Sequence, residues 1–148
     1  MSALAIAADH AGVALKAELV TELKKLGHEV IDLGPASTDS VDYPDFATKL
    51  TALVTAGTPA LGILVCGTGI GMSIAANKVK GIRAAVCRTE FEARATRQHN
   101  DANVLCLGQR VTGAGVALEI AKVFLSTGFE GGRHQARVDK VKALEGGR

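Results

Sequence analysis

The segment LGILVCGTGIGMS, residues 61–73, decides the fold of this chain. Its first six residues, Leu61 to Cys66, form an apolar run of strand length, and a turn with three glycines in five positions follows at once. A helix is expected directly behind that turn. A buried strand that leads through such a turn into a helix is typical of a parallel sheet covered by helices, in which ligands bind at the carboxyl ends of strands.

Short apolar runs alternate with longer amphipathic stretches along the whole chain. In the first such stretch Leu15, Leu19 and Leu23 recur at helical spacing, and Gly27 ends the helix. The predicted strands are 4–8, 29–33, 61–66, 82–87 and 104–107, and the predicted helices are 13–26, 44–56, one ending near residue 77, 90–99, 114–125 and 134–144. This order predicts an α/β fold: a three-layer α/β/α sandwich around a five-stranded, parallel, Rossmann-like sheet, with a C-terminal helical extension.

The length of 148 residues is that of one domain, 1–148, in which 129–148 form a C-terminal arm. The net charge is only +2, and five aromatic residues leave few platforms for base stacking, so no nucleic-acid partner is expected. No apolar run approaches the roughly 20 residues of a membrane span, and no signal peptide is recognisable. Three widely spaced cysteines suggest neither a disulfide framework nor a zinc site. We therefore expect a cytoplasmic protein with no membrane partner.

The turn after Cys66 is the most informative part of the sequence. Its glycines let backbone N–H groups converge at a helix start, an arrangement that favours negative charge and hence a thiolate at Cys66. A thiolate beside N–H donors suits proton abstraction next to a carbonyl, because the donors stabilise the enediolate that forms. The same pair would serve covalent acyl chemistry, and the residues alone leave both possibilities open.

Two other interpretations of this turn remain. Cys66 can be a small core residue at a strand end. The turn can also bind a nucleotide, since Gly67-Thr68-Gly69 begins a dinucleotide fingerprint. However, Met72 occupies the third glycine position, and Arg88 closes the next strand where an acidic residue is expected. Both departures argue against dinucleotide binding.

A second candidate site lies in the C-terminal arm. Arg133 and Arg137 are four residues apart, so on a helix their guanidinium groups share a face and can bind one phosphate. The alternative is a solvated helix face. Asp9 and His10 follow the first strand, where the polar side chains of a parallel sheet collect.

The remaining polar candidates are less specific. His99 can contact the carbonyl groups at a helix end, and Tyr43 can line or shield a pocket. The four histidines form no HxxxH or HxH pair and have no carboxylate cluster beside them, so no metal site is expected.

Several motifs together resemble the type B ribose-5-phosphate isomerases, which are grouped with the galactose-6-phosphate isomerase subunits in one sugar-phosphate isomerase family. The resemblance covers essentially the whole chain, in the family's order and approximate spacing. Its motifs are DHAG at 9–12, DYP at 42–44, CGTGIGMSIAANK at 66–78, GIRA at 81–84, HNDANV at 99–104 and EGGRH at 130–134.

The resemblance implies a role for each matching position. Cys66 would move the proton between C2 and C1, Thr68 would assist ring handling, and His99 would open the furanose ring. The N–H groups of Gly67, Gly69, Ile70 and Gly71 would hold the enediolate. Further contacts with the substrate or its phosphate would come from Asp9, His10, Asn100, Arg110, Arg133 and Arg137.

The implied reaction is a cofactor-free aldose–ketose isomerisation of D-ribose 5-phosphate and D-ribulose 5-phosphate through a cis-enediolate, in the non-oxidative pentose phosphate pathway. The resemblance implies no metal and no organic cofactor. It also implies a homodimer, or a dimer of dimers, with the active site at the subunit interface. Allose 6-phosphate, galactose 6-phosphate or a tetrulose phosphate are alternative substrates, and a non-catalytic nucleotide- or phosphate-sensing module is the alternative outside this class.

Overall fold

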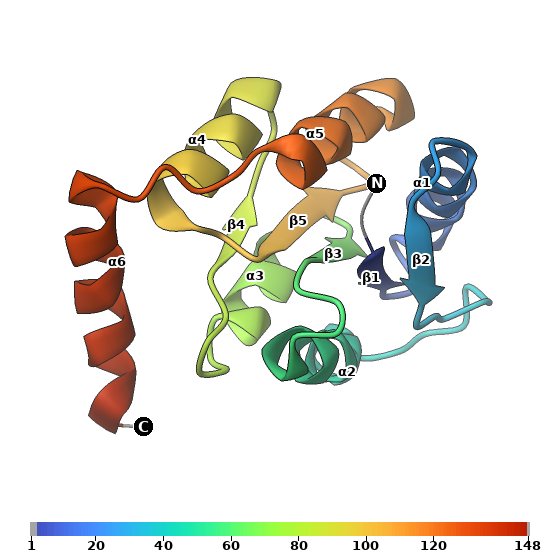
Figure 1. Cartoon of the computed structure of the whole chain (residues 1–148). Coiled ribbons are helices and arrows are strands. Elements are labelled where there is room, and N and C mark those ends of the chain that lie inside the picture. The colour runs from blue at the N-terminus through green and yellow to red at the C-terminus, as the bar shows by residue number, and fades with distance from the viewer. Residues whose placement is uncertain (1–2, 148) are drawn as a thin grey trace.

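Five parallel strands form one sheet in the computed structural model, which describes residues 3–147. The strands lie in the order β2-β1-β3-β5-β4 (Figure 1). Their bounds are β1 Ala3–Ala8, β2 Glu29–Asp32, β3 Gly62–Cys66, β4 Ala84–Val86 and β5 Val104–Gly108. All four strand pairs are parallel, which confirms the predicted sheet.

Helices cover both faces of this sheet and complete the predicted three layers. One buried cluster joins the strands to α1, α4 and α5, and a second joins them to α2 and α3. The helices are α1 Val13–Lys25, α2 Tyr43–Ala56, α3 Ile70–Ala76, α4 Glu90–Asn100, α5 Ala114–Ser126 and α6 Arg133–Ala143, followed by a short 3-10 helix, Leu144–Gly147.

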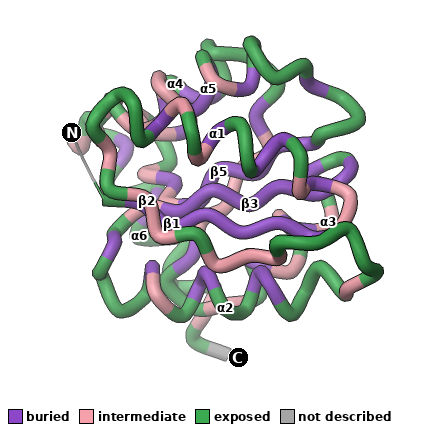
Figure 2. The backbone as a smooth tube through the Cα atoms, turned by 90° about the vertical axis from the view of Figure 1, so that its right-hand side faces the viewer, coloured by how far each residue is buried: buried purple, intermediate pink, exposed green. Residues whose placement is uncertain are grey.

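The central strands are apolar on both sides because both sides are covered. Along β1, Leu4 and Ile6 belong to one core and Ala5 and Ala7 to the other, as the two-residue period of a strand requires. Figure 2 shows β1, β3 and β5 as buried backbone between two helix layers. β4 is shorter than the predicted 82–87, because the N–H of Ile82 donates to the carbonyl of Val79 in a turn.

The strand order places a switch point between β1 and β3. From β1 the chain crosses to β2 on one side, and β3 then pairs with β1 on the other side. Loops leaving two such strands diverge and open a crevice at their carboxyl ends. Asp9 and Cys66 stand at the carboxyl ends of β1 and β3, so the switch point brings the first two predicted site segments together.

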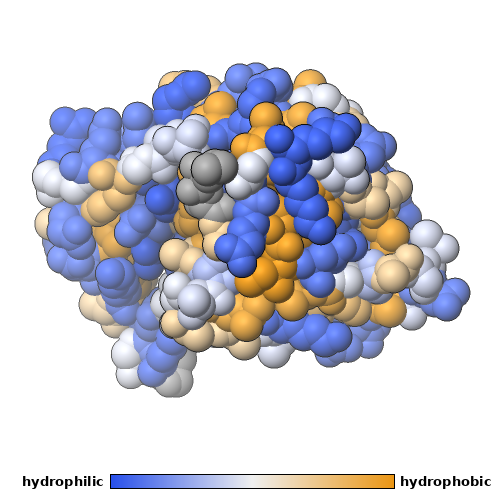
Figure 3. Space-filling model, turned by 45° about the vertical axis from the view of Figure 1, so that its right-hand side comes forward, coloured by the Kyte–Doolittle hydropathy of each residue, from blue (hydrophilic) through white to orange (hydrophobic). Residues whose placement is uncertain are grey.

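The C-terminal arm leaves the body of the domain. Helix α6 stands beside α4, away from the sheet (Figure 1), and its far end is tied back where the N–H of Gly81 donates to both Glu145 carboxylate oxygens at 3.1 and 3.2 Å. None of the described helices is long and apolar enough to cross a bilayer. The face in Figure 3 carries a central apolar patch bordered by hydrophilic side chains.

Candidate active site

Cys66 ends β3 and is held by the turn that follows it. The thiol is only 5% exposed, and the N–H of Gly69 donates to its Sγ at 3.1 Å. Gly69 has φ +81°, a left-handed conformation that other residues rarely adopt, and this conformation turns its N–H back toward the sulfur. The contact gives the sulfur a backbone hydrogen-bond donor and fixes its position relative to the turn.

The turn is pressed against β5, which fixes its position. A Cβ built on Gly108 would lie 2.6 Å from the backbone carbonyl carbon of Thr68, so only glycine allows this approach. Beyond β5, the N–H groups of Gln109 and Arg110 donate to the carbonyls of Cys66 and Gly67 at 2.9 and 3.0 Å. The backbone around the thiol is therefore held from two strands.

The start of α3 adds further donors near the thiol. Because the first N–H groups of a helix have no acceptor within the helix, those of Ile70 and Gly71 need acceptors outside it. The N–H of Ile70 donates to Thr68 Oγ1 at 3.2 Å. Two side chains border this turn: a Cβ on Gly71 would meet the Tyr43 ring at 2.9 Å, and one on Gly67 would meet Arg110 Nη1 at 3.2 Å.

Asp9 and His10 lie at the adjoining strand end. The buried Asp9 carboxylate accepts the N–H of Ala11 at 2.9 Å. Nδ1 of His10 lies 3.2 Å from both the nitrogen and the oxygen of Val41, in the loop before α2. We call this group, consisting of Asp9, His10, Tyr43, residues 66–71 and Arg110, the edge cluster.

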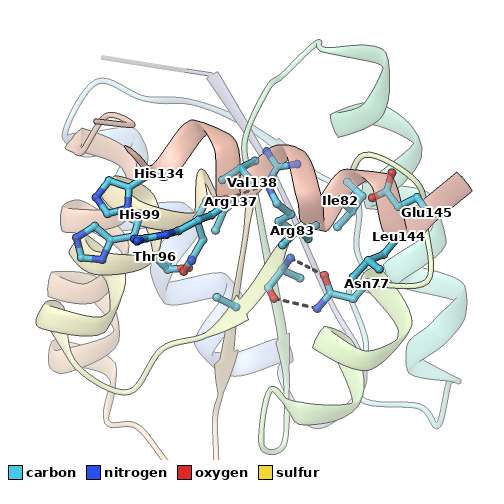
Figure 4. Close-up of a pocket in the computed structure, with 15 residues that line it drawn as sticks. Asn77, Ile82, Arg83, Thr96, His99, His134, Arg137, Val138, Leu144 and Glu145 are labelled. Atoms are coloured by element: carbon cyan, nitrogen blue, oxygen red, sulfur yellow. Dashed lines mark hydrogen bonds between the residues drawn. The ribbon is translucent and has the colours of Figure 1, made fainter. Parts of the chain in front are cut away.

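A second group of predicted residues lines a groove of about 600 Å³ between α6 and the body of the domain. His99, Asn100 and Arg137 line it together with His134, and we call these four residues the groove cluster. Figure 4 shows His99 and His134 next to each other toward one end of the groove, and Leu144 and Glu145 toward the other. Arg133, the first residue of α6, is exposed and lies outside this lining.

The segment that carries His99 and Asn100 is anchored behind the groove. Asp101 ends α4 with φ 48° and forms ion pairs with Arg97 at 3.2 Å and Arg83 at 3.4 Å. Thr96 Oγ1 donates to the side-chain oxygen of Asn100 at 3.0 Å. This hydrogen bond uses the amide oxygen of Asn100, so its NH₂ group can donate to a ligand in the groove.

His134 was not singled out in the sequence, yet it contacts His99 directly. The two rings stack with centroids 4.4 Å apart and 18° between their planes, and Glu130 Oε1 lies 3.4 Å from His134 Nε2. Burial, His99 and Arg133 lower the pKa of His134, while Glu130 acts in the opposite direction. Sequence spacing carries no signal for this pair, since one histidine comes from α4 and the other from α6.

The two clusters lie at opposite edges of the sheet. Cys66 pairs in register with Gly108 at the carboxyl end of β5, whereas His99 and Asn100 precede Val104 at its amino end. The five residues of β5 span about 13 Å at 3.3 Å per residue. Within one chain, therefore, Cys66 and His99 do not meet.

The other two thiols belong to the core. Burial, reinforced by Glu92, raises the pKa of Cys87 to about 12, and burial raises the pKa of Cys106 as well. Both thiols stay protonated near neutral pH. Cys66 is therefore the cysteine whose surroundings suit reactivity.

Comparison with known proteins identifies the family. A model described as Ribose/Galactose Isomerase matches residues 4–141. The chain belongs to this family. Ribose-5-phosphate isomerase B of Escherichia coli is 48% identical over 98% of this chain and 97% of its own length.

Solved structures in the family agree with the fold. Ribose-5-phosphate isomerase B of Clostridium thermocellum has a TM-score of 0.96 at 51% identity, covering 98% of both chains. The isomerase B of Mycoplasma genitalium, solved with bound ribulose 5-phosphate, has a TM-score of 0.93 at 44% identity, covering 99% of this chain and 97% of its own. The α/β fold predicted from the sequence is thus that of the family.

Proposed function

We propose that this chain interconverts D-ribose 5-phosphate and D-ribulose 5-phosphate. The observation that carries the proposal is the Gly69 N–H contact with Cys66 Sγ at 3.1 Å, which joins the side chain proposed as the base to the turn at the start of α3. Family membership and the ribulose 5-phosphate bound to the Mycoplasma genitalium relative support the substrate. In the cell, this reaction would belong to the non-oxidative pentose phosphate pathway.

The reaction needs proton transfers at ring opening, between C2 and C1, and between the oxygens O2 and O1. His99 opens the furanose ring by supplying a proton to the ring oxygen while the bond between that oxygen and C1 breaks and the C1 hydroxyl gives up its proton to water, which forms the aldehyde, with Thr68 assisting. Cys66 then takes the proton from C2, and the electron pair of the broken C–H bond forms the C1–C2 double bond of a cis-enediolate whose charge faces the N–H groups of the turn. Return of the proton to C1, with transfer of the O2 hydroxyl proton to O1, completes the ketose.

We propose further that the active site is shared between two copies of the chain. The opposite-edge positions of Cys66 and His99 leave each cluster incomplete alone, and a two-fold dimer would pair the edge cluster of one copy with the groove cluster of the other. Surface character supports this pairing: Ile70 and Ile74 on α3 are 46% and 57% exposed beside the edge cluster. The groove offers apolar side chains in return, namely Val138, Val141 and Leu144.

The phosphate contacts follow from the same arrangement. Arg137 in the groove cluster and His10 in the edge cluster would meet the phosphate from the two copies, with Asp9, Asn100, Arg110 and Arg133 as further contacts. No metal or organic cofactor enters these steps. The enzyme would act in the cytoplasm, and its three free cysteines suit a reducing compartment.

Conversion of ribose 5-phosphate in excess chelator, measured beside the Cys66→Ala variant, tests the reaction. The wild type should turn over, and the variant should lose about 10³-fold or more in kcat while substrate binding persists, because only the base is removed. Cys87→Ala is the matched control, since that thiol is buried in the core. Near wild-type rates in Cys66→Ala would refute the base assignment. An inactive wild type would refute ribose 5-phosphate as the substrate and favour a sugar phosphate with six or four carbons.

A further inference from the structure

We propose that His99, Glu130 and His134 form a binding site for a divalent transition metal of the Zn²⁺ type, and that metal bound there inhibits the isomerase. The inhibition half of this inference rests on the proposed function, because His99 is the group assigned to ring opening. The binding half rests only on the positions of three side chains.

The three residues offer a ligand set that Zn²⁺ commonly uses. Two imidazoles and one carboxylate form one of the ligand sets of zinc enzymes, in which a fourth position stays open to water. One ligand atom from each of the three residues lies within 4.8 Å of the other two. Within residues 3–147, these three form the one His/Cys/Asp/Glu group of this kind.

The distances are close to those that a bound ion requires. Ligand bonds of about 2.0–2.1 Å place two tetrahedral ligand atoms roughly 3.4 Å apart. Glu130 Oε1 and His134 Nε2 already have this spacing, at 3.4 Å. The imidazole of His99 has to come up to about 1.4 Å closer to complete the set. It also has to turn out of its stack with His134, because the lone pairs of two nearly parallel rings do not converge on one ion.

The surroundings of the three side chains suit a reversibly bound ion rather than a permanent structural one. The Glu130 carboxylate is 51% exposed and gives the ion a path from solvent, whereas the side chain of His134 is 10% exposed and fixed in place. Arg137 lines the same groove, and its positive charge opposes a cation. The site should therefore load reversibly and release its metal to a chelator.

A bound metal ion would inactivate the groove cluster, because it occupies the ring-nitrogen lone pair of His99 that otherwise carries the proton. A ring nitrogen of His99 that binds the metal cannot carry the proton needed at the ring oxygen of the sugar. The metal would also fix the His99 and His134 rings in one arrangement. Loss of ring opening should then appear as a lower rate that chelation reverses.

Metal binding is measured first, without reference to activity. Untagged Cys66→Ala protein, which lacks the competing thiol, is titrated with Co²⁺ and followed by its visible absorption. We expect one Co²⁺ per chain, displaced by Zn²⁺, and at least 10-fold weaker binding after Glu130→Gln. Glu119→Gln is the matched control, an exposed carboxylate on α5 paired with Lys122 at 3.1 Å, and should bind like its parent. Absence of Co²⁺ binding, or equal binding in Glu130→Gln, would overturn the site.

Inhibition is then measured with Zn²⁺ in protein that keeps Cys66. Glu130→Gln should retain basal activity, since glutamine still offers His134 an acceptor, while its inhibition midpoint rises at least 10-fold relative to wild type and Glu119→Gln. Chelator should restore wild-type activity. If Zn²⁺ inhibits Glu130→Gln equally, the metal acts at the Cys66 thiol and the inhibition half is wrong. If Cys66→Ala protein binds Co²⁺ as expected but the wild type isomerises no sugar phosphate, the proposed function fails while the metal site stands.

Discussion

The edge cluster and the groove cluster differ in what they are built from. In the edge cluster, six consecutive residues from Cys66 place backbone N–H groups around one sulfur, and close approach to β5 fixes the turn. In the groove cluster, side chains from α4 and α6 line an open groove of about 600 Å³, and His99 and His134 stack on each other there. The first is positioned within one sheet, and the second depends on an arm that stands away from it.

This difference fits the separate roles that we propose for the two clusters. Proton transfer at carbon needs donors held within a fraction of an ångström, which a backbone turn clamped between strands provides. Ring opening and phosphate binding need charged side chains that close on a ligand. We therefore expect steric changes to damage the edge cluster most, and charge changes to damage the groove cluster most.

Among steric changes, the largest effect should come from Gly108→Ala. The new Cβ would lie 2.6 Å from the Thr68 carbonyl carbon, so the turn must move away from β5 and carry its N–H groups with it. A displacement near 1 Å costs on the order of 100-fold in kcat. Steady-state kinetics with a thermal unfolding curve measures both consequences. Gly115→Ala on α5 is the control, because a Cβ there meets nothing within 4 Å. Wild-type kcat in Gly108→Ala would show that the turn tolerates movement.

Mixing two inactive variants tests whether the clusters cooperate across subunits. Cys66→Ala lacks the proposed base and His99→Asn lacks the proposed ring-opening group, so each homodimer should be nearly inactive. Random pairing after co-expression makes half of the dimers mixed, each with one intact site, which restores roughly a quarter of wild-type activity. Activity that stays at the level of the separate variants would place both residues of each site in one chain.

Sequence reasoning was accurate where the signal is local. Strand and helix bounds lie within about two residues of those predicted, because apolar periodicity and turn glycines mark them directly. The shortened β4 is the largest departure, since Ile82 is buried at a turn and is apolar for that reason. The edge cluster follows from the same local signals, because parallel strands deliver Asp9 and Cys66 to one edge.

The groove cluster was only partly predictable. Spacing placed Arg133 and Arg137 on one helix face, but only Arg137 lines the groove. The contact between His99 and His134 depends on where α6 packs, and no spacing rule covers two histidines from different helices. Apolar periodicity also does not predict the strand order β2-β1-β3-β5-β4. A long crossover connection can place a strand on either side of the strand before it. The roles assigned to these residues stay predictions.

A smaller effect is expected from Arg137→Ala. A charged hydrogen bond to phosphate contributes about 1.5–3 kcal/mol, which corresponds to a rise in KM of roughly 10- to 100-fold with little change in kcat if ground and transition states are bound alike. Lys140→Ala, on the same helix but outside the groove lining, is the charge-matched control and should keep a wild-type KM. A fall in kcat at constant KM would instead assign Arg137 to the transition state.

The smallest effect concerns the pH dependence of stability at the groove cluster. Burial, followed by His99 and Arg133, lowers the pKa of His134 in the folded state below its ordinary value of 6.5. At pH values between the folded-state pKa and 6.5, the unfolded chain binds more protons than the folded chain. The contribution of His134 to the free energy of unfolding is therefore complete above pH 6.5 and is lost as pH falls through the lower folded-state pKa. His134→Asn should therefore flatten the decline of Tm between pH 7 and 5, measured at fixed protein concentration. Gln135→Asn on the same helix removes no titrating group and should keep the wild-type slope. An unchanged slope in His134→Asn would mean that Glu130 cancels the effect of burial and leaves the pKa of His134 the same in the folded and unfolded states, and a steeper decline would mean that Glu130 outweighs burial.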